Sequence, residues 1–341
     1  MKRIQYISVL NVVACMSVVF LHVNGCFWNF SYEKYWVEAN IIESVFYFAV
    51  PIFFMITGAT LMNYRKRYST MEFLKKRFAK TVIPFIAWSI LGVIYVFEKA
   101  PASLEGATIA SLISGIMGNR YISIYWFFAP LFSVYLSIPV LSLIPEESRK
   151  EAFLYLTVAI FVTSSLAPFI AKLLGINYNT NLNIAVGGGY ILYVALGYLI
   201  SNYEISKKSR CIIYVLGISG LVAHIFGTWY LSYEAGKIVS TFKGYTNVPC
   251  ILYSTAIFVF FRYTDFSKAG KGIMKVVDFI SQYTFAVYLM HYYVIDIFRR
   301  ICMPDITGIK YRMIFPYCVM AICILLSIPA RKLPFIRKLI P

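Results

Sequence analysis

The chain contains three histidines, His22, His224 and His291, and each lies in or beside a long apolar segment. An imidazole inside a membrane span is costly unless it has a partner or faces a wet cavity, so such residues are candidates for proton transfer. The apolar segments also carry two acidic residues, Glu43 and Asp296. A carboxylate that holds one ring nitrogen of a histidine leaves the other nitrogen free to act as a base.

Other interpretations of these residues remain open. Glu43 and Asp296 fall near the predicted outer ends of their segments, where a carboxylate can simply face the wet interface. Imidazoles and carboxylates at similar depth would also suit the proton relay of a transporter. His224 has no neighbouring signal, and we expect it to be a core histidine satisfied by a backbone carbonyl.

The first apolar segment, IQYISVLNVVACMSVVFLH, spans residues 4–22. Its polar members Ser8, Asn11, Cys15 and His22 are three, four and seven residues apart, which places them on one helical face. Asn11 and His22 would lie about three turns, or roughly 16 Å, apart along that helix. No small-x-small cleavage site follows, so we expect a retained helix rather than a signal peptide. This face is a candidate wall of a site.

Composition indicates an all-α, polytopic integral membrane protein. Of the 341 residues, 60% are hydrophobic and 14% charged, and the mean hydropathy is +0.71. A soluble domain of this size would need far more polar surface. We predict a bundle of about ten transmembrane helices at 5–24, 41–63, 81–97, 122–144, 153–174, 186–201, 211–232, 247–262, 282–298 and 313–330. They form a single transmembrane domain over residues 1–341, with no separate soluble domain.

The net charge of +17 does not indicate nucleic-acid binding. The basic residues lie in short loops between apolar runs, where they report topology and suit anionic lipid headgroups. Most of the 32 Lys and Arg residues fall on one side when both termini are cytoplasmic, so the positive-inside rule predicts that orientation.

One predicted cytoplasmic stretch, between the second and third spans, is strongly basic. It contains Arg65-Lys66-Arg67 and the run Phe73-Leu74-Lys75-Lys76-Arg77-Phe78-Ala79-Lys80. Lys76 and Lys80 are four residues apart, so this amphipathic turn presents a cationic face. Such a face holds either the phosphates of a soluble ligand or lipid headgroups.

The outer loops and the cysteines are less specific. The segments SYEKYWVEAN and GINYNTNLN are rich in Tyr, Trp and Asn, which suit sugars but also belt membrane interfaces. The seven cysteines lack metal-ligand spacing, and no metal site is predicted. Cys26 and Cys302 both fall outside, so a disulfide between them is left open. No G-x-S-x-G, P-loop, H-E-x-x-H or dinucleotide motif occurs, so any chemistry must come from residues gathered between helices.

Several motifs, in their order and spacing, resemble the membrane-bound acyltransferase family three over essentially the whole chain. They are the first helix, Val-Pro-Ile-Phe-Phe-Met-Ile-Thr-Gly at 50–58, the basic run ending Arg77-Phe-Ala-Lys80-Thr-Val-Ile-Pro84, Tyr125-Trp126-Phe127 with Tyr135 and Pro139, and Tyr283-Thr-Phe-Ala-Val-Tyr288-Leu-Met-His291.

This resemblance implies about ten core helices and transfer of an acyl group, often acetyl from cytoplasmic acetyl-CoA, onto hydroxyls of extracytoplasmic glycans, lipid-linked sugars or peptidoglycan. The first-helix histidine, here His22, is the family's catalytic residue. The basic cluster after the second helix would help to hold the donor's phosphates, which suits Arg65, Arg67, Arg77 and Lys80.

The chain departs from the family pattern in its first helix. The family has Asp-x-x-Arg, then ten residues, then His, whereas this chain has Ser8-Val-Leu-Asn11 before His22. Asn11 can hydrogen-bond but supplies no positive charge. The outer Trp-x-x-x-x-Glu pattern of many sugar-acylating members is also absent, because Trp126 is followed by Phe-Phe-Ala-Pro.

The leading hypothesis is an integral-membrane O-acetyltransferase of a bacterial plasma membrane that modifies a cell-envelope sugar. His22, oriented by Glu43 and assisted by Asn11, would deprotonate the acceptor hydroxyl, and acetyl-CoA would be the donor. The expected substrate-binding residues are Trp126, Tyr288 and His291. The alternative is a transporter or exporter of a small polar molecule or glycan that uses the same bundle. The oligomeric state is left open.

Overall fold

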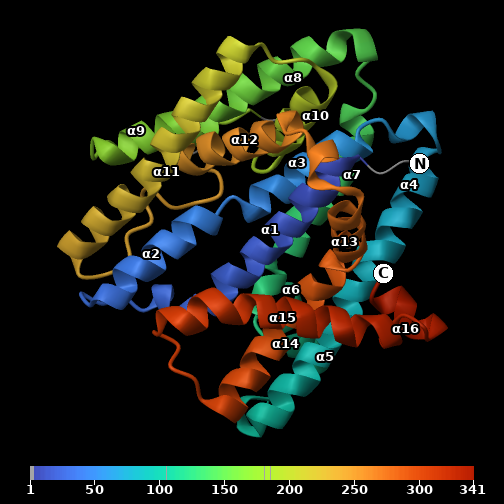
Figure 1. The fold of residues 1–341 in the computed structure, drawn as a ribbon, viewed down its shortest axis with the longest axis vertical. Coiled ribbons are helices and arrows are strands. Elements are labelled where there is room, and N and C mark those ends of the chain that lie inside the picture. Colours follow the sequence, from blue (N-terminus) through green and yellow to red (C-terminus); the bar gives the residue numbers. More distant parts are fainter. Residues whose placement is uncertain (1–3, 105, 180, 185) are drawn as a thin grey trace.

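The computed structural model describes residues 4–104, 106–179, 181–184 and 186–341, and every regular element within them is a helix (Figure 1). The predicted all-α fold is therefore confirmed. The α-helices are α1 (Gln5–Val23), α2 (Lys34–Phe46), α3 (Ala49–Leu61), α4 (Thr70–Arg77), α5 (Ile83–Lys99), α6 (Ile109–Met117), α7 (Phe128–Leu141), α8 (Glu146–Phe161), α9 (Ala167–Leu173), α10 (Ile191–Asn202), α11 (Lys207–Ala235), α12 (Val248–Tyr263), α13 (Lys271–Ser281), α14 (Thr284–Cys302), α15 (Ile309–Ala330) and α16 (Pro334–Leu339).

Seven continuous helical segments of the described chain are long and apolar enough to cross a membrane. The pair α13 and α14 makes an eighth if counted as one span, although it is bent by 64°. The helices α10 and α12 are apolar but shorter. Each of these ten segments overlaps one of the ten predicted spans. The protein is thus a multi-pass membrane protein.

The second predicted span, 41–63, differs from the structure in one respect. The helix begins earlier, at Lys34, and a turn at Tyr47 and Phe48 divides it into α2 and α3. Pro51 explains the break, because proline has no N–H to donate to the carbonyl four residues earlier, that of Tyr47.

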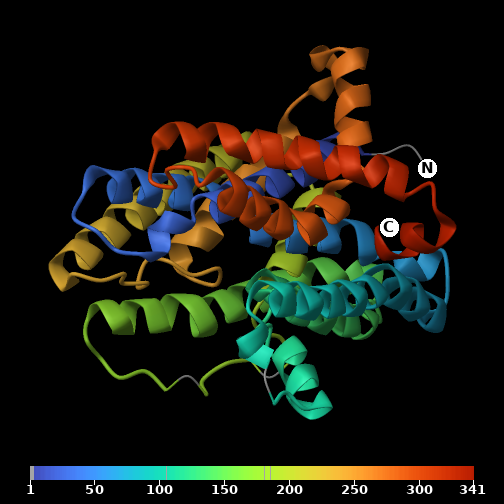
Figure 2. The ribbon, with the colours of Figure 1, turned by 90° about the horizontal axis from the view of Figure 1, so that it is seen from below.

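The helix α1 lies within the bundle and packs against α2, α3, α12, α13, α14 and α15. Figure 2 shows α8 and α9 on the face opposite to α15, and α13 projecting sideways from the neighbouring helices. The central position of α1 explains why its polar side chains face other helices rather than lipid.

Helices α3 and α10 touch through their backbones because each places a glycine at the contact. A Cβ on Gly58 would lie 2.0 Å from the Val194 carbonyl oxygen, and a Cβ on Gly197 would lie 2.0 Å from that of Met55. Small residues permit such close approach in membranes, where burial of apolar surface adds little to helix association.

Both ends of the described chain lie at the same end of the molecule (Figures 1 and 2). Helix α16 packs against the π-helix η3 (Phe78–Val82) and α5, so the C-terminal segment lies beside the basic stretch. We call this the basic end. The positive-inside rule predicts that this end faces the cytoplasm.

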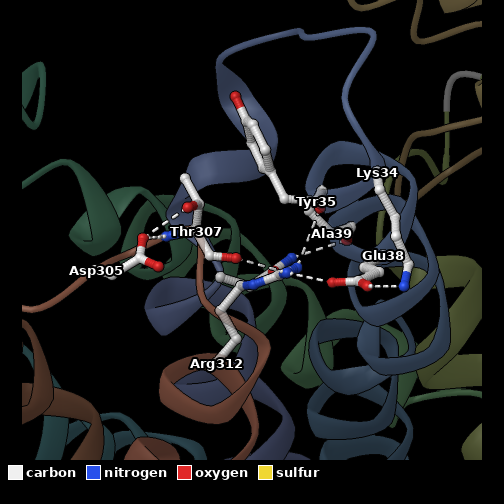
Figure 3. Close-up of polar contacts among 8 residues, drawn as sticks. Lys34, Tyr35, Glu38, Ala39, Asp305, Thr307 and Arg312 are labelled. Atoms are coloured by element: carbon white, nitrogen blue, oxygen red, sulfur yellow. Dashed lines mark hydrogen bonds and ion pairs between the residues drawn. The ribbon is translucent and has the colours of Figure 1, made fainter.

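At the opposite end, which we call the distal end, Arg312 ties the start of α15 to α2 (Figure 3). Its completely buried guanidinium donates to Glu38 Oε2 at 2.7 Å and to the Thr307 carbonyl at 2.8 Å. It also donates to the Tyr35 carbonyl at 3.2 Å. A buried charge requires such partners, so this contact holds the α14–α15 loop against α2.

Candidate active site

His22 lies in the last turn of α1, and its backbone is held from α14. Arg299 Nη2 donates to the carbonyls of His22, at 3.4 Å, and Val23, at 3.0 Å. The last carbonyls of a helix have no partner within it, and a cation is favourable beside the negative end of the helix dipole. Arg299 therefore closes the turn that carries the histidine.

The rings of His22 and His291 are hydrogen-bonded to each other, with 2.8 Å between His22 Nδ1 and His291 Nε2. His291 is fully buried in α14, and its Nδ1 lies 3.0 Å from the Val287 carbonyl oxygen. A carbonyl only accepts, so a neutral His291 carries its proton on Nδ1 and accepts at Nε2. His22 must then donate from Nδ1, which leaves its Nε2 lone pair available as a base.

A central cavity of about 390 Å³ extends along α1. Most of its wall is aliphatic or aromatic, and it reaches from Asn11 and Thr81 to His22. The lining residues come from α1, η1 (Gly25–Trp28), α2, α3, η3, η5 (Ser123–Phe127), α7, α14 and two connecting segments: Asn11, Val18, Leu21, His22, Trp28, Glu43, Tyr47, Val50, Phe53, Ile56, Thr57, Thr81, Ile124, Trp126, Phe127, Leu131, Tyr135, Tyr245, Thr284, Phe285 and Tyr288.

Two further cavities adjoin the central one at its ends. The basic-end cavity, of about 470 Å³, shares Thr81 and Tyr135 with it and is also lined by Lys75 and Arg77. The distal cavity, of about 400 Å³, shares five residues with it: Leu21, His22, Trp28, Ile124 and Trp126. His22 therefore stands in the wall between the central and distal cavities.

The four predicted phosphate-binding residues differ in their contacts and exposure. Arg77 lines the basic-end cavity, its guanidinium 5.8 Å from the centre of the Tyr135 ring. Arg67 and Lys80 are exposed. Arg65 instead donates to Ser142 Oγ at 2.8 Å and to the Pro139 carbonyl at 3.2 Å, so it holds the end of α7.

The expected contact between Glu43 and His22 is wrong. Glu43 Oε1 lies 2.8 Å from Nζ of Lys243, and both side chains are buried. Lys243 comes from the loop after α11 and also lies 3.6 Å from the centre of the Tyr47 ring. Burial lowers the pKa of the Lys243 amine, and Glu43 opposes that shift. Because lysine and glutamate lie 200 residues apart, no local pattern predicted the pair.

Asp296 also has partners other than histidine. Its carboxylate accepts from Tyr95 Oη at 2.6 Å and from Lys99 Nζ at 2.9 Å, and it lies 3.4 Å from Arg300 Nε. It lines the distal cavity together with His22. The hydrogen-bond partner of His22 among the described residues is thus another histidine, His291, rather than either carboxylate.

His224 is buried as expected, but its Nε2 does not make the expected hydrogen bond to a backbone carbonyl. Its Nε2 has no hydrogen-bond partner among the described residues, and its ring packs edge-on against Tyr47 at 5.1 Å. His224 lines none of the three cavities.

Asn11 lies in the wall of the central cavity but not beside His22. Its amide donates to Thr284 Oγ1 at 2.9 Å and to the Ser281 carbonyl at 3.2 Å. These contacts hold the bend between α13 and α14 against α1. The structure thus shows a positioning contact where the family has a cation.

Trp126 and Tyr288 line the central cavity, as their predicted binding role requires. Trp126 stacks on Tyr245 at 5.4 Å, and Tyr288 donates to the Ile124 carbonyl at 2.6 Å. His291 instead lies behind His22, as its hydrogen-bond partner. The structure shows the positions of these three residues, and their roles in substrate binding stay predictions.

Three residues of the site region, Arg299, Lys243 and Lys75, were not predicted from the sequence. Arg299 could have been predicted to have a partner. It lies two turns after His291 on an apolar helix, where an unpaired charge is costly. Lys75 lies in the basic run, where the sequence does not distinguish it from the neighbouring cations. The two thiols left open as a disulfide, Cys26 and Cys302, are free.

Comparison with known proteins agrees with the motifs in the sequence. A sequence model of the acyltransferase family three, described as an acyltransferase domain, matches residues 4–330. Neither a curated protein nor a solved structure matches the chain. The family match covers nearly the whole chain and includes every cavity described above. The chain therefore belongs to the acyltransferase family three and is a membrane acyltransferase of that family.

Proposed function

We propose that the protein transfers an acetyl group from cytoplasmic acetyl-CoA to a hydroxyl of an extracytoplasmic cell-envelope sugar, in a bacterial plasma membrane. The observation that carries this proposal is the position of His22, in the wall between two cavities that adjoin opposite parts of the bundle. A base in that position can meet a donor from one side and an acceptor from the other.

The donor would enter at the basic end. Lys75 and Arg77 line the basic-end cavity, where they can contact the phosphates of CoA, and exposed Arg67 and Lys80 lie on the same stretch. The narrow arm of acetyl-CoA that carries the acetyl group would pass Thr81 and Tyr135 into the central cavity. The apolar walls of that cavity exclude water and so limit hydrolysis of the thioester.

His22 acts as the general base in this proposal. Its Nε2 takes the proton of the acceptor hydroxyl while the oxygen attacks the thioester carbonyl carbon. When the tetrahedral intermediate collapses, the carbon–sulfur bond breaks and His22 returns the proton to the sulfur of CoA. His291 Nε2 accepts the Nδ1–H of His22 throughout, and this hydrogen bond becomes stronger while His22 is charged.

The acceptor would reach His22 through the distal cavity. Trp28 and Trp126 are shared by the distal and central cavities, and their rings can stack on the apolar face of a sugar. Tyr288, whose hydroxyl is bound to the Ile124 carbonyl, contributes its ring to the wall.

The test of donor binding is a calorimetric titration of the purified full chain with acetyl-CoA, CoA and pantetheine. Acetyl-CoA and CoA should bind in the micromolar range, and pantetheine, which lacks the nucleotide phosphates, should bind much more weakly. Failure of the folded protein to bind either CoA compound would contradict the proposal.

A transporter remains the second candidate because the three adjoining cavities also suit passage of a small polar molecule. It predicts flux of a polar solute across liposomes containing the protein and no need for acetyl-CoA. Flux that persists unchanged without donor, together with absent CoA binding, would favour it.

A further inference from the structure

The distal cavity carries an unusual set of charges beside His22. Asp296 and Arg299 line it, and Lys99 and Arg300 contact the Asp296 carboxylate from the side. The cavity wall and its immediate neighbours thus carry three cations and one carboxylate, an excess of positive charge.

Asp296 does not make the cavity repel anions, because neighbouring groups compensate its negative charge. Lys99 Nζ lies 2.9 Å from Oδ1 and 3.1 Å from Oδ2, and Arg300 Nε lies 3.4 Å from Oδ2. Tyr95 donates to the same carboxylate at 2.6 Å. Two cations and a hydroxyl group within the protein thus compensate the charge of the carboxylate.

Arg299 keeps part of its guanidinium available. Its Nη2 donates to two carbonyls of α1, and its Nε donates to Tyr311 Oη at 3.1 Å. Its Nη1 makes no hydrogen bond to any described residue, although Arg299 lines the cavity. The N–H groups of Nη1 can therefore donate hydrogen bonds to an anionic oxygen of a ligand.

We infer that the distal cavity takes an acceptor that carries an anionic group, a phosphate or a carboxylate, close to the hydroxyl that is acetylated. Arg299 Nη1 contacts that group, and Lys99 and Arg300 add long-range attraction at the rim. The rings of Trp28 and Trp126 take the apolar face of the same molecule. This inference rests on the proposed function and narrows its substrate class.

The test compares glucose 1-phosphate with methyl glucoside, two probes with the same ring that differ in charge. In calorimetry with the full chain in a neutral detergent, the phosphate should bind at least tenfold more tightly than the glucoside at low salt. Its advantage should shrink as salt is added, because the rim charges are exposed. Equal binding of the two probes, or binding of neither, would overturn the inference.

Variants assign the anion preference to these residues. Lys99→Gln should weaken binding of glucose 1-phosphate by several-fold, whereas Asp296→Asn, which removes the one negative charge, should tighten it. Arg299→Gln should abolish the preference, and Arg299→Lys should keep part of it. A preference that is unchanged in all four variants would contradict the assignment.

Two controls separate this inference from its alternatives. Each variant is also titrated with CoA, so loss of CoA binding reports a failure of the fold or of the donor site rather than of the anion site. The titrations are then repeated in nanodiscs of phosphatidylcholine and of phosphatidylglycerol. If phosphatidylglycerol alone displaces the sugar phosphate, the anion site belongs to a lipid headgroup and the acceptor assignment is overturned.

Discussion

At the scale of single residues, the site depends on hydrogen bonds that set the state of one ring. The Val287 carbonyl holds the proton of His291 on Nδ1, and His291 in turn holds the proton of His22 on Nδ1. In the proposed mechanism, this two-histidine chain orients the base without a carboxylate. Arg299 holds the backbone of the same turn, so both the ring and the main chain of His22 are positioned from α14.

The first prediction concerns His291. Replacing it with Phe removes the acceptor for His22 Nδ1–H, a hydrogen bond to a group that becomes charged in the transition state. Such bonds contribute about 1.5–3 kcal/mol, so kcat should fall by roughly tenfold to a hundredfold. Steady-state kinetics should show little change in the KM for acetyl-CoA.

A matched change at His224, which lines none of the cavities, is the control for this experiment. His224→Phe should leave kcat near the wild-type value. Equal losses of kcat in both variants would mean that His291 acts through stability of the bundle and not through His22.

At the scale of elements, the site is built where helices meet closely or are broken. Glu43 of α2 and Tyr47 in the turn after it line the cavity, and the bend before α14 is held by Asn11. The glycines of α3 and α10 allow a backbone contact that brings α3, with Phe53 and Thr57, to the cavity.

The second prediction concerns that contact. In Gly58→Ala the new Cβ would lie 2.0 Å from the Val194 carbonyl oxygen, a backbone atom that cannot move alone. The helices must separate, at a cost of about 1–3 kcal/mol or more. Thermal unfolding of the detergent-solubilised protein should begin at a clearly lower temperature.

The comparison for this variant is Gly272→Ala in α13. No atom lies within 4 Å of the Cβ position at Gly272, so this variant should unfold at or slightly above the wild-type temperature. An unchanged unfolding temperature in Gly58→Ala would show that α3 and α10 do not touch as described.

At the scale of the whole molecule, three adjoining cavities form a series that has cations at both ends. Lys75 and Arg77 lie at the basic-end cavity, the central cavity is mainly apolar, and Arg299 lies at the distal cavity. The third prediction follows from this order. Arg77→Glu should weaken CoA binding by tenfold or more at low salt, and by less at high salt, since exposed charge contacts are screened.

Lys208→Glu provides the matched control, because Lys208 is exposed at the start of α11 and lines none of the cavities. It should leave CoA affinity unchanged at every salt concentration. A defect in Arg77→Glu that does not depend on salt would indicate misfolding rather than loss of a phosphate contact.

The sequence predicted what is local and missed what joins distant segments. Ten apolar runs, the family and the placement of His22 on the first helix all followed from residues close together in the chain. The Glu43–Lys243 pair and the His22–His291 hydrogen bond join residues at least 200 positions apart, and hydropathy or spacing carries no information about such contacts. Local patterns predicted that His22 and His291 lie at similar depth in the membrane, but not that their rings are in contact.

The most direct test of the account follows labelled acetyl from acetyl-CoA into cell-envelope material, in membranes that contain the wild-type protein or His22→Ala. Calorimetry on the same two proteins should show equal CoA affinity, because His22 lies at the end of the central cavity away from Lys75 and Arg77. Label transfer by His22→Ala should fall by at least about a hundredfold, the usual contribution of a general base. Transfer within a few-fold of wild type would contradict the central claim that His22 is the base.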